Sequence, residues 1–231
     1  MRELARAPRH QALNGEHGAR TAEGWNHSKK KSFTPSEQQR VDVRAKRAAF
    51  LAQIAGIEPE RLVFLDESGC NIAMATTHGR APAGVRVADS KPANWGNNIT
   101  IVGAIKNDRV VCHQTLEGAM NKPRLIDFVR HVLCPRLPKG SVVVLDNLRA
   151  HHAPEIREAI EAVGSFVMHT PPYSPDLNPI ELCWSFVKGW LRRLAQRTTH
   201  ALRKAINNTM LRVRTTQLVG WFRHCGYGQR K

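Results

Sequence analysis

Residues 171–181 read Pro-Pro-Tyr-Ser-Pro-Asp-Leu-Asn-Pro-Ile-Glu, and the rest of the chain is organised around this stretch. Its prolines fix the backbone φ angle and exclude a regular strand or helix before Asn178. Asn178 then suits the N-cap of a helix, Pro179 its first position and Glu181 its third. The stretch therefore predicts a stiff arm that holds the Glu181 carboxylate at a helix start. The same spacing also fits a capping box, in which Glu181 would only cap its own helix.

The composition is that of a soluble and strongly basic protein. Its 231 residues suffice for one sizeable core with extensions. No apolar run approaches the roughly 20 residues of a membrane span, and the first residues show no secretory signal. The formal net charge of +16 predicts a polyanionic partner, most commonly nucleic acid. Ribosomal RNA or an anionic membrane surface would fit the charge equally well.

The pattern of cysteines indicates the cellular compartment in which the protein is expected. All five stand singly in the sequence, without the paired Cys or Cys/His spacing of a zinc site. They are typical of reduced, mostly buried thiols, which predicts a cytoplasmic protein.

The first 60 residues differ from the rest of the chain. Residues 1–28 are polar without a sustained period, and we expect a disordered or remnant segment there. Residues 29–60 start with three lysines and are expected to form a basic connector helix, laid on the core or on DNA. Thr34 is its expected N-cap, followed by Pro35, and its small residues 41, 45, 48, 49 and 52 share one face.

From residue 61 onward the pattern predicts alternating strands and helices. Continuous apolar runs indicate strands that are covered on both faces, and 3.6-residue spacing indicates helices. Strands are expected at 62–65, 71–76, 99–105, 110–116, 141–145 and 165–168, and helices at 125–133, 154–163, 179–194, 202–211 and 217–222. The order gives an α/β fold, a mixed sheet with helices on both faces and helical N- and C-terminal extensions.

Two of these strands lead into aspartates. Asp66 and Asp146 each follow four apolar residues, and ligands of open α/β sheets gather beyond the carboxyl ends of strands. The proline arm can bring Glu181 to the same place. Three such carboxylates repel one another unless a cation joins them, and an all-oxygen set selects Mg²⁺ or Mn²⁺. Two such ions would support an in-line phosphoryl displacement, so the chain is expected to cut or join nucleic acid.

Three segments carry a family resemblance. Residues 65–69 (LDESG), 144–147 (VLDN) and 171–181 resemble the acidic motifs of DDE transposases, closest to the bacterial insertion-sequence branch of the Tc/mariner superfamily. Thirty-four residues separate Asp146 from Glu181, which is the spacing of that branch. Residues 79–84 and 222–227 also resemble its members. The resemblance extends over about residues 29–227.

The resemblance implies a ribonuclease-H-like fold with Asp66, Asp146 and Glu181 as catalytic, metal-binding residues. It implies two Mg²⁺ or Mn²⁺ ions, cleavage of double-stranded DNA at transposon ends, and attack of the freed 3′-hydroxyl on target DNA at TA. A homo-oligomer acting in the bacterial cytoplasm, at the nucleoid, is expected. We expect residues 61–195 to form the catalytic domain and residues 196–231 a helical extension.

Relatives of this kind carry helix-turn-helix modules, for which residues 1–28 are too few. We therefore expect an upstream-encoded part to recognise the transposon ends. Two other functions stay open. A catalytically silent DNA-binding remnant would not need the three acids, and a ribonuclease-H-like nuclease or resolvase would not need the proline arm.

Other side chains near the acids have alternative interpretations. Glu67 follows Asp66 in the strand and faces the other side, which favours a supporting role over metal binding. Asn147 either orients Asp146 or only forms the turn, and His151 with His152 either positions a phosphate or water or marks a helix entry. Asp176 is expected to hold the shape of the arm. Trp184 and Trp190 have the spacing of core residues, which favours packing in the core over stacking of their rings on DNA bases.

Overall fold

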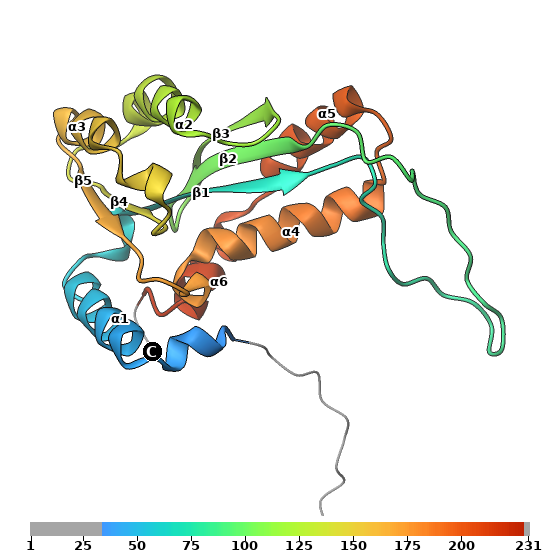
Figure 1. Ribbon diagram of the computed structural model, residues 1–231, viewed down its shortest axis with the longest axis horizontal. Coiled ribbons are helices and arrows are strands. Elements are labelled where there is room, and N and C mark those ends of the chain that lie inside the picture. Colours follow the sequence, from blue (N-terminus) through green and yellow to red (C-terminus); the bar gives the residue numbers. More distant parts are fainter. Residues whose placement is uncertain (1–33, 229–231) are drawn as a thin grey trace, which may run out of the picture. The chain divides into compact units, whose positions relative to one another are not determined.

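The predicted mixed sheet is confirmed by the computed structural model, which describes residues 34–228. Its five strands lie in the order β3-β2-β1-β4-β5 (Figure 1). Their bounds are β1 Leu62–Cys70, β2 Ile99–Ile105, β3 Val110–Glu117, β4 Val142–Leu145 and β5 Phe166–His169. The first three form an antiparallel meander, and β4 and β5 run parallel to β1. The segment 1–28 and the three lysines after it lie outside the described residues.

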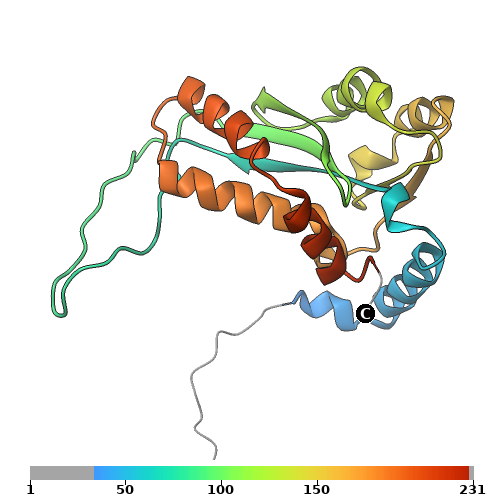
Figure 2. The same ribbon diagram turned by 180° about the vertical axis from the view of Figure 1, so that it is seen from behind.

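Helices cover both faces of the sheet, as Figures 1 and 2 show. The α-helices are α1 Val41–Ile54, α2 Lys122–Phe128, α3 Pro154–Ala162, α4 Pro179–Leu194, α5 Thr199–Met210 and α6 Thr215–His224. A π-helical turn, η3 (Val129–Leu133), continues α2. The 3₁₀ turns are η1 Ser36–Gln39, η2 Pro59–Arg61, η4 Cys134–Arg136, η5 Arg149–His152 and η6 Pro175–Leu177.

Strand β1 divides the core in two because its side chains alternate between the faces. Val63 and Leu65 pack in the cluster that includes α2 and α3. Leu62 and Phe64 pack in the other cluster, with α1, α4, α5 and α6. The next residue on the Phe64 face is Asp66, which therefore lies under α4.

The connector differs from its prediction. Its first turn is the 3₁₀ segment η1, Arg40 is extended, and α1 begins only at Val41. Thr34 is not the N-cap, and the residue at that position, Pro35, makes no side-chain cap. The buried face of α1 consists of the larger residues Val43, Phe50 and Ile54, whereas Val41 is exposed. Val43, Phe50 and Ile54 share one face of the helix because they are seven and four residues apart, so position on the helix and not side-chain size decides which residues are buried.

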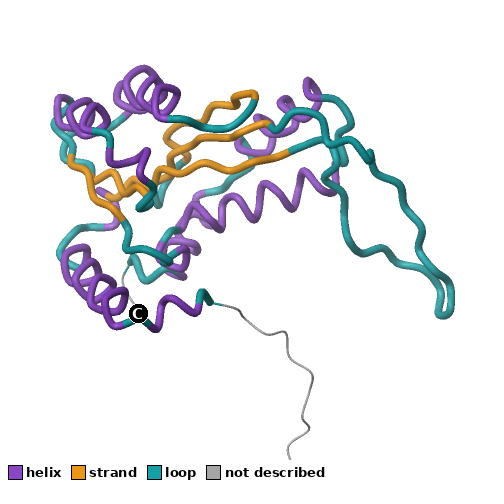
Figure 3. The backbone as a smooth tube through the Cα atoms, in the orientation of Figure 1, coloured by secondary structure: helices purple, strands orange, loops and turns teal. Residues whose placement is uncertain are grey.

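Three strand predictions also need correction. Strand β1 does not end at Leu65 but continues to Cys70, because its main chain keeps pairing with β2. Residues 71–76 form no strand, and Figure 3 shows the whole connection from β1 to β2 as loop. Strand β5 is an edge strand rather than a buried one, and its Phe166 is exposed.

The structure also shows the state of the cysteines and the length and character of the helices. All five cysteines are free and buried, as expected for packed thiols. Among the described residues, no helix combines the length and the apolar character needed to cross a bilayer.

Candidate active site

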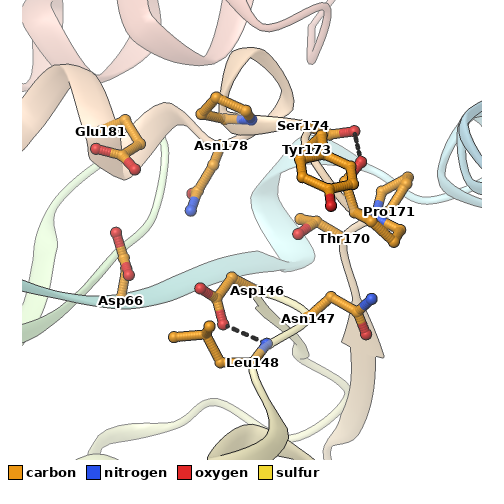
Figure 4. Close-up of a pocket in the computed structure, with 12 residues that line it drawn as sticks. Asp66, Asp146, Asn147, Leu148, Thr170, Pro171, Tyr173, Ser174, Asn178 and Glu181 are labelled. Atoms are coloured by element: carbon orange, nitrogen blue, oxygen red, sulfur yellow. Dashed lines mark hydrogen bonds between the residues drawn. The ribbon is translucent and has the colours of Figure 1, made fainter. Parts of the chain in front are cut away.

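The three acids of the sequence motifs line one pocket of about 420 Å³. Figure 4 shows Asp66 on β1, Asp146 just after β4 and Glu181 in the first turn of α4, around a common space. Most of the remaining wall consists of residues 170–175 and Asn178 of the arm, together with Asn147 and the exposed Leu148. The topology explains the meeting point, since β4 ends at Leu145 and leaves β1 without a parallel neighbour at Asp66.

Asp66 forms the buried wall of the pocket. Its side chain is only 7% exposed, and its Oδ2 accepts a hydrogen bond of 3.0 Å from Nε1 of Trp184. Gly103 on β2 allows this approach, because a Cβ there would come within 3.1 Å of the Trp184 ring. Burial, reinforced by repulsion from Glu181, raises the pKa of Asp66 to about 7. A bound cation would offset that cost.

Asp146 has a different environment. Its Oδ1 accepts a hydrogen bond of 3.0 Å from the amide of Leu148, which fixes the turn after β4. The same oxygen contacts Nδ1 of His151, a fully buried ring whose Nε2 lies 3.3 Å from Oε2 of Glu67. Burial alone would raise the pKa of Asp146, but the His151 contact outweighs it and the pKa is lowered. The two carboxylates likewise hold the pKa of His151 above its usual range, against the effect of burial.

Glu181 is an exposed acid that lines the pocket. No side-chain hydrogen bond caps the start of α4, so the capping-box interpretation of Glu181 does not hold. Asn178 does stand at the N-cap position, but its side chain also lies toward the pocket (Figure 4). Partial burial and the charge of Asp146 raise the pKa of Glu181, while Lys188 opposes the shift.

The donor chemistry of the pocket fits a hard divalent cation. It offers three carboxylates and is also lined by Asn178, whose buried Oδ1 has no hydrogen-bond partner among the described residues. Within residues 34–228 no three acidic, histidine or cysteine side chains stand close enough to enclose a metal ion as they are. Trp184 and His151 hold the two aspartates at different walls of the pocket.

The remaining candidate residues lie near the pocket in supporting positions. Glu67 points to the opposite face of β1 and reaches Asp146 only through His151. The side chain of Asn147 pairs with His152 rather than with Asp146, its Oδ1 lying 2.7 Å from His152 Nε2. Asp176 points away from the pocket to Arg47. Of the two tryptophans, Trp184 is buried in the core as expected.

The sequence interpretation missed the roles of two side chains and left that of a third open. The sequence indicates only a helix cap at Asn178, although its place one turn before Glu181 signals a shared direction. It indicates a core residue at Trp184, whose spacing of three from Glu181 is compatible with both roles. For His151 it allows two interpretations, because the burial of this ring against two carboxylates depends on distant strands that no local pattern reveals.

Comparisons with known proteins agree with this architecture. The family model described as DDE superfamily endonuclease matches residues 61–203. No curated protein matches the chain. Among solved structures, the Mos1 transposase paired-end complex with the left transposon end has a TM-score of 0.68 at 17% identity. That match covers 86% of this chain but only 63% of the Mos1 chain.

Two further Mos1 structures have the same fold. The mariner Mos1 paired-end complex with Mg has a TM-score of 0.68 at 16% identity, covering 90% of this chain and 69% of that chain. The catalytic domain of the Mos1 mariner transposase has a TM-score of 0.55 at 12% identity, covering 84% and 90%. At these identities the likeness shows the fold, which is ribonuclease-H-like as expected.

The sequence match decides the family. It extends over more than half of the chain and contains Asp66, Asp146 and Glu181 together with the strands and the helix that carry them. The resemblance to DDE transposases that the three motifs indicate is therefore confirmed at the level of family and fold. The chain belongs to the DDE superfamily endonucleases.

Proposed function

We propose that the chain is the catalytic part of a transposase that cuts DNA at transposon ends and joins the freed 3′-hydroxyl to target DNA at TA dinucleotides. The observation that carries the proposal is the pocket shared by Asp66, Asp146 and Glu181 in a member of this endonuclease family. Solved structures of similar fold include Mos1 complexes with a transposon end, with Mg and with Mn.

In this proposal Asp66, Asp146 and Glu181 are the catalytic carboxylates and hold two divalent cations, Mg²⁺ or Mn²⁺. Activation of an attacking oxygen and stabilisation of a leaving oxygen are the chemistry that such ions supply when bound. Trp184 orients Asp66 through its N–H, and His151 keeps Asp146 ionised and fixed. Asn178 adds a neutral oxygen beside Glu181.

DNA retention is proposed to come from the excess of basic side chains. The formal charge of +16 favours phosphate contacts, which position DNA without reading its sequence. The same proposal includes a catalytic domain of residues 61–195, an oligomer on DNA, and an additional helix-turn-helix part that reads the ends. A bacterial cytoplasmic, nucleoid-associated location completes it.

A cleavage assay with the purified chain and Mg²⁺ tests the proposal. The substrates are a duplex with the DNA that flanks its gene, a scrambled duplex, a branched junction and an RNA–DNA hybrid. We expect metal-dependent nicking of the first duplex and joining of its 3′ end to a TA-containing plasmid. Cleavage of only the junction or the hybrid would indicate a resolvase or ribonuclease, and DNA binding without cleavage would indicate a silent remnant.

A further inference from the structure

The outer side of the proline arm is bound to the connector that precedes the sheet. Arg47 on α1 donates hydrogen bonds of 3.0 and 2.7 Å to the two carboxylate oxygens of Asp176. Its Nη1 also donates to Oγ of Ser174 at 2.7 Å. Gln38 on η1 donates to the carbonyl of Tyr173 at 2.7 Å and to Asp176 at 3.0 Å. Two side chains of the connector thus bind three residues of the arm, Tyr173, Ser174 and Asp176.

The arm is also fixed from the other end of the chain. The hydroxyl of Tyr227 donates a buried hydrogen bond of 2.6 Å to the carbonyl of Leu177. Tyr173 adopts a φ of 56°, a left-handed conformation that costs a non-glycine residue free energy. Such a conformation persists only where its surroundings hold it, and Gln38 contacts the carbonyl of that very residue.

Arg47 differs from the other cations of α1. Its side chain is only 19% exposed and forms a bidentate pair with a carboxylate, the geometry that makes arginine pairs strong and directional. Arg44 and Lys46 on the same helix are exposed and have no salt-bridge partner within the described residues. Burial opposes ionisation of Asp176, but the Arg47 bonds outweigh it, so the pKa of Asp176 is lowered and the pair stays charged.

Movement at Asp176 would reach the pocket directly. Only Leu177 separates Asp176 from Asn178, and Glu181 lies in the first turn of the helix that begins at Pro179. The prolines on either side leave few backbone angles free to absorb a displacement. A shift of the arm must therefore move the side chains at the start of α4.

We propose that Arg47, assisted by Gln38, is a positioning residue that ties the connector to the proline arm and thereby sets Glu181 in the catalytic pocket. The geometry of the pocket then depends on a segment more than a hundred residues earlier in the chain. This inference rests on the proposed function only for its effect on cleavage. The tie itself is a property of the metal-free protein.

A charge swap tests this tie. We compare wild type with Arg47→Glu, Asp176→Arg, the double variant, and Arg44→Glu as a control of equal charge change on the same helix. Three quantities are measured: the single-turnover cleavage rate at saturating DNA, the salt dependence of DNA binding, and hydrogen exchange of the Leu177 and Asn178 amides without metal. Arg47→Lys provides a milder variant, and melting temperatures confirm that each protein folds.

Each single swap should lower the cleavage rate by about 10- to 100-fold, the cost of a small misplacement of a reacting group. Both should speed exchange at Leu177 and Asn178, and the double variant should recover rate and protection. Arg44→Glu should leave both unchanged. Arg47→Lys should fall between wild type and Arg47→Glu, because lysine keeps the charge but loses the bidentate geometry.

Two results would overturn the inference. If Arg47→Glu weakens DNA binding and its salt dependence while Asp176→Arg has no effect, Arg47 is a phosphate contact. If neither swap changes exchange at Leu177 and Asn178, the arm is held without the pair. Should wild type fail to cleave any DNA, the proposed function fails, while the exchange measurement still decides whether the tie exists.

Discussion

The two aspartates of the pocket come from neighbouring parallel strands, yet their surroundings are opposite. Asp66 lies inside β1, almost fully buried, with a neutral Trp184 N–H as its hydrogen-bond donor. Asp146 lies beyond the end of β4, half-exposed, against the buried ring of His151. Both acids follow four apolar residues in the sequence, so their sequence contexts look equivalent.

This difference in surroundings shifts the pKa values of the two aspartates in opposite directions. Burial raises the pKa of Asp66 to about 7, and the nearby Glu181 adds to the shift. The pKa of Asp146 is lowered instead, because contact with His151 outweighs its burial. The carboxyl group of Asp66 thus has a pKa near neutral pH, whereas the lowered pKa of Asp146 favours its ionised form. Two acids with one proposed role can therefore have opposite effects on stability.

The largest expected effect concerns the catalytic role that both aspartates share with Glu181. Asp66→Asn, Asp146→Asn and Glu181→Gln should each lower metal-dependent cleavage by about 1,000-fold or more, a loss of several kcal/mol of transition-state stabilisation. DNA retention should stay nearly unchanged, since phosphate contacts supply it. Strand cleavage and filter binding measure the two properties. Robust cleavage by Glu181→Gln would show that Glu181 is not a catalytic carboxylate, and neither neighbouring acid could replace it in place, since Glu67 contacts His151 and Asp176 is bound to Arg47.

The second prediction concerns the property in which Asp66 and Asp146 differ, namely their effect on the stability of the metal-free protein. The folded pKa of Asp66 is raised, so its contribution to stability is complete below the unfolded pKa of about 3.9 and is lost as pH rises through 7. Asp66→Asn should therefore raise the melting temperature at pH 8 by a few degrees, and the gain should vanish near pH 4. Asp146→Asn should lower it at pH 8, because His151 loses a carboxylate partner.

Thermal unfolding from pH 4 to 9 measures both effects, and Mg²⁺ provides a control. The ion should stabilise wild type at pH 8 and neither variant, because each lacks one of the proposed ligands. The comparison of the two walls fails if both aspartate variants shift the melting temperature in the same direction at pH 8.

Much of the fold could be predicted because its strands carry a strong signal. Residues 142–145 are buried on both faces and therefore read as one apolar run. The end of β1 could not be predicted, since Glu67, Ser68 and Gly69 lack that pattern and are held by main-chain pairing with β2. The late start of α1 could not be predicted either, because Arg40 is extended without a proline or glycine to signal it, and its side chain pairs with the nearby Asp42.

The candidate site divides in the same way. The acids could be located from the strands and the prolines, because these features restrict the chain locally. Their partners could not, since His151 and Trp184 act across elements that only the folded sheet brings together. Arg47 and Asp176 are 129 positions apart, so no spacing rule connects them. In the sequence, Arg47 belongs to a helix expected to lie on DNA or on the core, and Asp176 is a turn residue expected to hold the shape of the arm.

The smallest expected effect concerns the single donor on the buried wall. Trp184→Phe keeps most of the ring volume but removes the N–H that favours the ionised form of Asp66, so the pKa of Asp66 should rise by a fraction of a unit. In a plot of melting temperature against pH, the midpoint of the decrease caused by ionisation of Asp66 should move upward by the same amount. Stabilisation by Mg²⁺ should weaken a few-fold at pH 7. Trp190→Phe is the matched control on the same helix, because that ring faces Arg193 and Arg212 rather than the pocket. Equal shifts in both variants would show that loss of ring packing, and not the hydrogen bond to Asp66, produces the change.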